Sequence, residues 1–150
     1  MLSLGCTDPA ANNYDANAQC DDGSCCYGTA FNLNINTDGY YAYRLGWEIQ
    51  DNNGNTIASG GNQAGESYST NSNYNYDICL PDSSCDVYSL VLYDYGHHGW
   101  YESTAVLTDD SGNVVIGGEP GSCCWYSQTS SFNVEITGCI DPTATNYDPT

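Results

Sequence analysis

Oxygen-bearing side chains of the kinds that bind calcium crowd the first part of the chain. Four carboxylates and two amides fall within fifteen residues that show no helix or strand pattern: Asp8, Asn13, Asp15, Asn17, Asp21 and Asp22. Calcium takes about six to eight oxygen ligands and mixes carboxylates with amides and carbonyls. Because such a loop cannot bury apolar surface, disulfides and a cation are the candidates for ordering it. The sequence predicts calcium here, and the alternative is a disulfide-held linker whose acids only interact with water.

The same motif opens again near the end of the chain. Residues 5–15 and 138–148 share Gly, Cys, Asp, Pro, Ala, Asn, Tyr and Asp at a constant offset, since Cys139 follows Cys6 by 133 positions. The second copy carries Asp141, Asn146 and Asp148, which are too few ligands for a closed site. We therefore expect one full period plus the opening of the next, with the second metal site completed by a following repeat or a neighbouring subunit.

Nine cysteines in 150 residues are natural for an oxidising compartment. They are Cys6, Cys20, Cys25, Cys26, Cys79, Cys85, Cys123, Cys124 and Cys139. We therefore expect a secreted, extracellular or cell-surface protein with disulfides. Zinc is a poor alternative, because the sequence has no CxxC pair.

The spacing of the cysteines suggests several pairings. Cys79 and Cys85 flank a short turn and are expected to bridge locally. Two of Cys6, Cys20 and Cys25 are expected to pair within the first repeat. Neighbouring cysteines are too strained to bond each other. A bridge between the vicinal pairs 25–26 and 123–124 would clamp the repeat to the rest of the chain. Cys139 is then left over, and an odd cysteine suggests an intermolecular bond.

The charge of the chain excludes several partners. The net charge is -18, and Arg44 is the single basic residue. Nothing could neutralise the phosphates of a nucleic acid or bind an anionic membrane, and no stretch is apolar enough to span a bilayer. The negative charge either only keeps the protein soluble or is partly neutralised by bound cations. Residues 1–4 are too short for a signal peptide, so we expect a mature terminus or a fragment.

Apolar residues alternate with polar ones over most of the middle of the chain. This period predicts strands near 31–35, 43–49, 74–78, 105–107, 114–116 and 132–136. Residues 87–93 are apolar on both faces, which favours a central strand. We expect an all-β, jelly-roll-like sandwich of about eight strands over residues 28–137. Residues 1–27 form the acidic repeat before it, and residues 138–150 form the partial copy after it.

A second repeat lies inside the sandwich. Residues 51–57 parallel residues 109–115 at an offset of 58, and a Gly pair follows each segment. Asn53-Gly54 and Ser111-Gly112 are hairpin turn signals. Two independent turns would explain the turns alone, but the shared flanking residues favour two related hairpins.

Aromatic residues in or near loops suggest a third kind of surface. They are Tyr40, Tyr41, Trp100, Tyr101, Trp125 and Tyr126. Such rings could stack on sugars, contact another subunit or pack into the core of the sandwich itself. We expect His97-His98 to lie in an ordinary exposed loop. The chain has no GxSxG, HExxH or phosphate-binding loop, so no enzyme is expected.

Residues 5–9, 13–15 and 21–25 resemble the GCTDP–NYDP–DDGSC acidic repeat of secreted bacterial and algal multi-repeat proteins, and residues 138–150 resemble it in part. The middle of the chain resembles a β-sandwich module found beside such repeats. This second resemblance rests on residues 47–51, 78–85 and 93–100, where His97-His98 replaces a usual Asp. The resemblances imply an extracellular surface or adhesive protein, rarely with a catalytic role.

These observations predict a structural subunit of an extracellular filament or cell-surface array. Its modules would join head to tail, copy to copy, through calcium-bound and disulfide-tied acidic repeats. The alternative is a carbohydrate-binding or adhesin module of a secreted protein, with glycans as partners.

Overall fold

Strands make up nearly all of the regular structure in the computed structural model, which describes residues 2–81, 87–118 and 126–133. The strands are β1 (Leu4–Gly5), β2 (Cys20–Asp21), β3 (Thr29–Asn36), β4 (Leu45–Gln50), β5 (Thr56–Gly61), β6 (Asn73–Leu80), β7 (Val87–Asp94), β8 (Thr104–Asp109), β9 (Val114–Gly118) and β10 (Ser127–Asn133). Two three-residue 3-10 helices, η1 (Ala42–Arg44) and η2 (Asn62–Ala64), complete the described elements. No helix in these ranges is long and apolar enough to cross a membrane.

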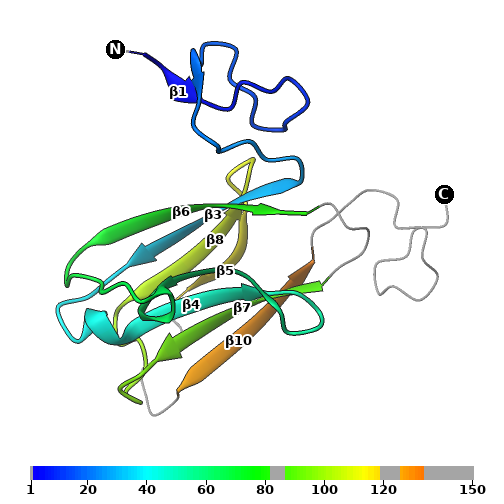
Figure 1. Cartoon of the computed structure of the whole chain (residues 1–150). Helices are drawn as coiled ribbons and strands as arrows, with labels where there is room; N and C mark the ends of the chain where they lie inside the picture. Colours follow the sequence, from blue (N-terminus) through cyan, green and yellow to red (C-terminus); the bar gives the residue numbers. More distant parts are fainter. Residues whose placement is uncertain (1, 82–86, 119–125, 134–150) are drawn as a thin grey trace, which may run out of the picture.

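Two antiparallel four-stranded sheets pack face to face (Figure 1). The strand order is β10-β7-β4-β5 in one sheet and β6-β3-β8-β9 in the other, and β1 and β2 form a separate parallel pair. The predicted all-β sandwich is confirmed at the level of two antiparallel sheets. The jelly-roll class is a finer statement that the strand order does not by itself establish.

The core between the sheets follows the alternation seen in the sequence. In β3, Phe31, Leu33 and Ile35 are buried, while the intervening asparagines face outward. Strand β7 lies between β4 and β10 and buries three consecutive residues, which confirms the expected central strand. The largest fully buried hydrophobic side chains are Trp47, Trp100, Leu33, Ile35, Ile49, Leu80, Leu90 and Leu107.

One predicted strand starts later than the alternation suggests. Tyr43 belongs to η1 and is 49% exposed, and β4 begins only at Leu45. The cause lies just before it, where Tyr41 takes a left-handed conformation with φ of 55° and turns the chain into the 3-10 helix. Residues 134–136 of the last predicted strand lie outside the described residues.

The segments 51–55 and 109–113 form the same turn, one in each sheet. In both, the Asp carboxylate accepts hydrogen bonds from the backbone N–H groups two and four residues on, at 2.8 and 2.8 Å in the first and 3.0 and 2.7 Å in the second. Gly54 and Gly112 take φ of 80° and 82°, which favours glycine. Each hairpin also has a register shift that leaves one residue of the strand after the turn, Ile57 or Val115, without a partner in the pairing. These shared details support two related hairpins.

The two halves of the sandwich exchange these hairpins. In the first half β3 pairs with β6, whereas the β4–β5 hairpin lies in the other sheet. In the second half β7 pairs with β10, whereas the β8–β9 hairpin lies beside β3. Each sheet therefore combines the outer pair of one half with the hairpin of the other. Because each sheet is complete only with strands from both halves, we expect the sandwich to fold as one unit.

Acid titration tests the shared turn. Hydrogen bonds from Asn55 and Asn113 lower the pKa of Asp51 and Asp109 from the ordinary 3.8. A lowered folded-state pKa gives stability that is present above the unfolded value and is lost as pH falls through the folded value. The variant Asp51→Asn/Asp109→Asn should therefore show a flatter acid limb when Tm is followed by circular dichroism between about pH 6 and about pH 2. The two single variants should contribute equally, and an unchanged acid limb would show that the carboxylates do not matter.

Candidate functional site

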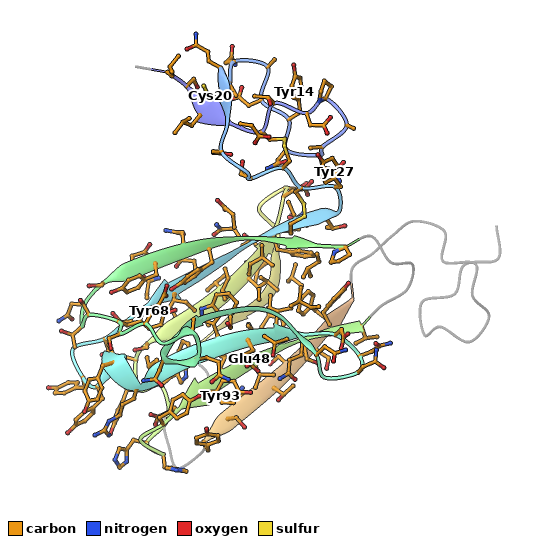
Figure 2. All side chains as sticks on the ribbon, in the orientation of Figure 1. Tyr14, Cys20, Tyr27, Glu48, Tyr68 and Tyr93 are labelled. Carbon is orange, nitrogen blue, oxygen red and sulfur yellow. A yellow bond between two sulfur atoms is a disulfide. The ribbon has the colours of Figure 1, made fainter. Side chains whose placement is uncertain are left out.

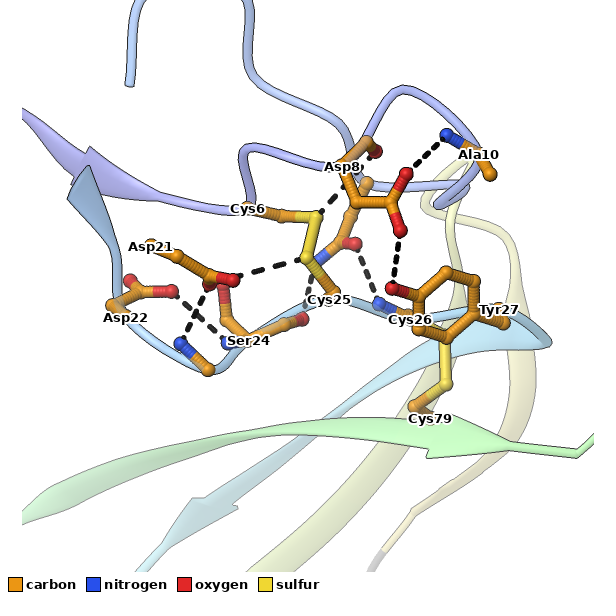
Figure 3. Close-up of a disulfide and its surroundings, with 12 residues drawn as sticks. Cys6, Asp8, Ala10, Asp21, Asp22, Ser24, Cys25, Cys26, Tyr27 and Cys79 are labelled. Atoms are coloured by element: carbon orange, nitrogen blue, oxygen red, sulfur yellow. Dashed lines mark hydrogen bonds between the residues drawn. A yellow bond between two sulfur atoms is a disulfide. The ribbon is translucent and has the colours of Figure 1, made fainter. Parts of the chain in front are cut away.

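The N-terminal repeat is built on two disulfides from consecutive residues (Figure 3). Cys6 bonds Cys25, which confirms that two cysteines of the repeat pair with each other. The next residue, Cys26, bonds Cys79 near the end of β6. Among the described residues, Cys20 is a free cysteine. The repeat is therefore closed on itself and also fixed to the sandwich.

Two of the expected pairings are wrong. Cys79 does not bond Cys85, because the pairing of β3 with β6 places Ala30 opposite Cys79 and brings Cys26 within reach. The two vicinal pairs do not bond each other, because Cys25 and Cys26 are both used in the disulfides above. The remaining cysteines lie outside the described residues: Cys85, Cys123, Cys124 and Cys139.

The acidic side chains predicted to bind calcium close turns of the backbone. Each of four carboxylates accepts a hydrogen bond of 2.8–3.0 Å from the N–H group two residues on: Asp8 from Ala10, Asp15 from Asn17, Asp21 from Gly23 and Asp22 from Ser24. This is the Asx-turn use of aspartate. The Asn13 side chain joins distant parts of the repeat, since it donates to the Ser24 carbonyl at 2.6 Å and accepts from the Cys26 N–H at 2.7 Å.

Asp8 has a second partner across the repeat. The Tyr27 hydroxyl donates to Asp8 Oδ2 at 2.6 Å (Figure 3). This hydrogen bond lowers the pKa of Asp8 and raises the pKa of Tyr27. The loop that carries Asp8 is thus tied to the segment that leads into the sandwich.

The carboxylates of the repeat are not gathered around one centre in the described residues. No three His, Cys, Asp or Glu side chains of the described residues come together in a way that could hold a metal ion. The carboxylates point to separate backbone turns instead of one centre. Asp141, Asn146 and Asp148 lie outside the described residues. Calcium binding stays a prediction.

Exposed tyrosines gather at the opposite end of the sandwich, where β3 and β7 end and β4 and β8 begin. We call this set the tyrosine end: Tyr40, Tyr41, Tyr43, Tyr95, Tyr101 and Tyr126. It contains four of the aromatic residues singled out in the sequence. Trp100 is instead fully buried in the core, and Trp125 lies outside the described residues.

A buried Trp and a buried Asp hold the loop that carries part of the tyrosine end. The Trp100 side chain donates from Nε1 to the Tyr93 carbonyl at 3.0 Å. The Asp94 carboxylate is 2% exposed and accepts hydrogen bonds from the backbone N–H groups of Gly96 at 2.7 Å and His98 at 2.5 Å. The loop between them is therefore a rigid support for its exposed rings.

Arg44, the only basic residue of the chain, lies among these rings. Its guanidinium carbon is 4.4 Å from the ring centroid of Tyr41 and 5.2 Å from that of Tyr43. Its Nε donates to the Tyr43 hydroxyl at 3.1 Å. Tyr41 also contacts the rings of His98 and Tyr101, at centroid distances of 6.3 and 6.4 Å. The cation thus organises one group of aromatic rings by cation–π contacts.

The backbone is strained at three of the ring-bearing positions. Tyr41, His97 and Tyr101 have φ of 55°, 59° and 51°, and Asn71 is the one other non-glycine residue with positive φ in the described ranges. A left-handed conformation costs an L-residue about 1–2 kcal/mol, and such strain concentrates at functional sites. The strain therefore marks this end of the sandwich as the candidate site.

Beside these rings, a nearly buried carboxylate organises the outer face of the β10-β7-β4-β5 sheet. Glu48 is 8% exposed and accepts hydrogen bonds from Gln63 at 2.6 Å, Gln50 at 2.7 Å and Tyr93 at 3.0 Å. Figure 2 shows Glu48 and Tyr93 on neighbouring strands. Burial alone would raise the pKa of Glu48, but these hydrogen bonds, together with one from Thr56, outweigh it and lower the pKa. Burial and the bond to Glu48 raise the pKa of Tyr93 to about 12.

This carboxylate network continues into the second group of rings. Tyr93 stacks on Tyr95 at 6.1 Å, and Tyr95 meets Tyr126 edge to face at 5.4 Å. The Tyr95 hydroxyl donates to the side-chain oxygen of Gln63, and the His97 ring lies 5.3 Å from Tyr126. The site therefore combines exposed rings with fixed amide and carboxylate groups.

Sequence reasoning missed several members of this site. Glu48, Gln63 and Tyr93 come from three separate segments, and only the pairing of β4 with β5 and β7 brings them together. Tyr43 and Arg44 carried a local signal, since the only cation of the chain ends a Tyr-rich run at residues 40–44.

Comparison of the chain with protein-family models, with curated proteins and with solved structures found no match. Its function is therefore argued from the geometry of the chain.

Replacing the buried carboxylate tests the network. Glu48→Gln puts an amide where three donors converge, so at least one buried donor loses its acceptor, at a cost of about 1–3 kcal/mol. Urea unfolding at neutral pH should show this loss. The exposed Glu66→Gln variant is the matched control and should leave stability unchanged. Equal stability of both variants would mean that the network does not constrain the sheet.

Proposed function

We propose that this chain is a structural module of an extracellular surface assembly, in which the acidic repeat is a rigid connector. The observation that carries the proposal is the pair of disulfides at consecutive residues. Cys6–Cys25 closes the repeat, and Cys26–Cys79 fixes it to β6 one residue later. Disulfides persist in oxidising surroundings, which supports an extracellular location for the module.

The joint between repeat and sandwich relies on this covalent bond. A pocket of about 430 Å³ lies between the two parts, with the carboxylates of Asp22 and Asp77 on its wall beside the Cys26–Cys79 disulfide. Close packing therefore does not fill the whole space between them. The Cys26–Cys79 bond is a second covalent link beside the chain itself, and it prevents the repeat from swinging relative to the sandwich.

The chain enters and leaves the sandwich at one end. Thr29 at the start of β3 pairs with Leu80 at the end of β6, and Asn133 at the end of β10 pairs with Val87 at the start of β7. Only residues 81–86 separate β6 from β7, so the start of β3 and the end of β10 lie close together (Figure 1). In a chain of such modules, the repeats would form a spine, and each sandwich would project from it with its tyrosine end outermost.

In this proposal calcium does not order a single repeat but acts between two copies. The hydrogen-bonded turns and the disulfides already account for the order of one repeat. Calcium would add stiffness only where two copies meet and share ligands. Reduction is therefore expected to loosen the connector within one module, and chelation is not.

Removal of the second disulfide tests the connector. The Cys26–Cys79 bond closes a loop with a sequence separation of 53, so the variant Cys26→Ser/Cys79→Ser should lose about 4 kcal/mol of unfolding free energy in the chain-entropy model. Small-angle scattering should show a wider range of distances between repeat and sandwich. Chelator added to the unaltered chain should change neither measurement.

The variant Cys6→Ser/Cys25→Ser is the matched control, because it opens the repeat but keeps the link to β6. It should lose about 3 kcal/mol from its shorter loop without freeing the repeat from the sandwich. A connector that stays fixed without Cys26–Cys79, or that loosens in chelator, would contradict the proposal.

Electron microscopy of a chain with three modules in tandem tests the arrangement. We expect a thin spine with sandwiches projecting to the side, because entry and exit lie at one end of each sandwich. Sandwiches strung in line, with the spine passing through each of them, would contradict this geometry.

A further inference from the structure

We propose that the tyrosine end, with the Glu48 network beside it, binds a neutral glycan chain. The connector needs nothing from this end, since the repeat and the exit of β10 lie at the other end of the sandwich. Figure 2 places Tyr14 and Tyr27 on the repeat, well apart from Tyr93. The proposed connector therefore does not account for the exposed rings of the tyrosine end.

The exposed rings are held in place before any ligand arrives. Tyr41, Tyr95 and Tyr126 are 45, 38 and 42% exposed, so one side of each ring packs against the protein and part remains open to solvent. Buried Trp100 and Asp94 fix the loop beneath them. Rigid aromatic side chains bind with little loss of conformational entropy. The flat C–H face of a pyranose is the kind of surface that packs on such a ring.

Polar groups beside the rings match the hydroxyl groups of a sugar. Glu48, Gln50 and Gln63 combine hydrogen-bond acceptors and donors within one network, and the Tyr95 hydroxyl belongs to it. Ligand sites typically pair an aromatic wall with a few precisely placed polar groups. The Arg44 group of rings lies next to this network, since the Tyr95 N–H donates to the Arg44 carbonyl at 3.2 Å. Two groups of rings along one surface suit a chain of several sugar units.

Charge and composition favour a neutral glycan over the other occupants. A net charge of -18 repels a second copy of this chain and acidic polysaccharides alike, whereas a neutral sugar chain meets no such repulsion. The exposed large apolar residues of this end are all tyrosines in the described ranges, while exposed aliphatic residues such as Ile57 and Val114 lie on β5 and β9. The exposed large apolar residues of this end are therefore aromatic without exception in the described ranges.

Binding to neutral oligosaccharides tests the proposal. The probes are hexasaccharides of β-1,4-glucose, β-1,3-glucose, β-1,4-mannose and N-acetylglucosamine, followed by isothermal titration calorimetry, with alginate as the acidic comparison. We expect at least one neutral probe to bind and alginate not to bind. Tyr95→Ala/Tyr126→Ala should weaken binding about tenfold or more, which is about 1.4 kcal/mol. Tyr95→Phe/Tyr126→Phe should keep most of the affinity, because the rings remain.

Tyr14→Ala is the matched control, because Tyr14 is similarly exposed, at 45%, but lies on the repeat. It should bind as the unaltered chain does, and circular dichroism should show that every variant keeps its fold. Binding that is absent for all neutral probes, or that survives loss of both rings, overturns the proposal. Self-association that depends on Tyr95 and Tyr126, measured by analytical ultracentrifugation, would assign the surface to a second copy and also overturn it. Neither result bears on the proposed connector, which is tested separately with the disulfide variants.

Discussion

The exchange of hairpins between the two sheets is the constraint on which the rest of the structure depends. Trp47 comes from one sheet and Tyr76 from the other, and their rings meet at 4.9 Å in the core. Trp47 Nε1 also donates to the Tyr68 hydroxyl at 3.0 Å, and a Cβ on Gly60 would come within 2.5 Å of that nitrogen. Across the halves, Phe31 of β3 meets Phe132 of β10 at 5.6 Å, also between the two sheets. The two sheets, each built from both halves, therefore stabilise each other only when both halves are folded. Two ends result from this arrangement: one carries the matched Asp turns and the repeat, and the other carries longer loops.

The strands could be predicted from the sequence because alternation is a local signal. Phe31, Leu33 and Ile35 show it directly, and the repeated turn predicts both hairpins. Strand pairing is not local, so the sequence did not reveal that the hairpins would change sheets. The same limit explains the error over Cys79, whose partner was sought nearby in the chain. Its true partner, Cys26, is brought to it by the pairing of β3 with β6.

In the candidate sites, too, composition identified the residues, but only the geometry showed what they do. Composition identified the acidic residues of the repeat, but Asp8 and Asp22 bind the N–H groups of Ala10 and Ser24, and those bonds decide what the carboxylates do. Composition also identified aromatic loops, yet it could not separate buried Trp100 from exposed Tyr101, its next neighbour. That difference arises from backbone direction, since Tyr101 adopts positive φ and turns its ring away from the core. Neither outcome can be derived from residue type alone.

The strained backbone under three aromatic residues bears on the proposed roles of the two ends of the sandwich. Left-handed backbone at Tyr41, His97 and Tyr101 costs on the order of 3–6 kcal/mol in total, against a typical domain stability of about 5–15 kcal/mol. Burial does not offset this cost, because Tyr41 and Tyr101 remain 45 and 37% exposed. A sandwich that only had to separate connectors could use glycine or asparagine at these positions without the strain. The interlocked core is stable enough to tolerate this cost. The strained backbone fixes the positions of the aromatic rings at the end farthest from the repeat. In the functions proposed above, assembly and recognition would lie at opposite ends of one fold.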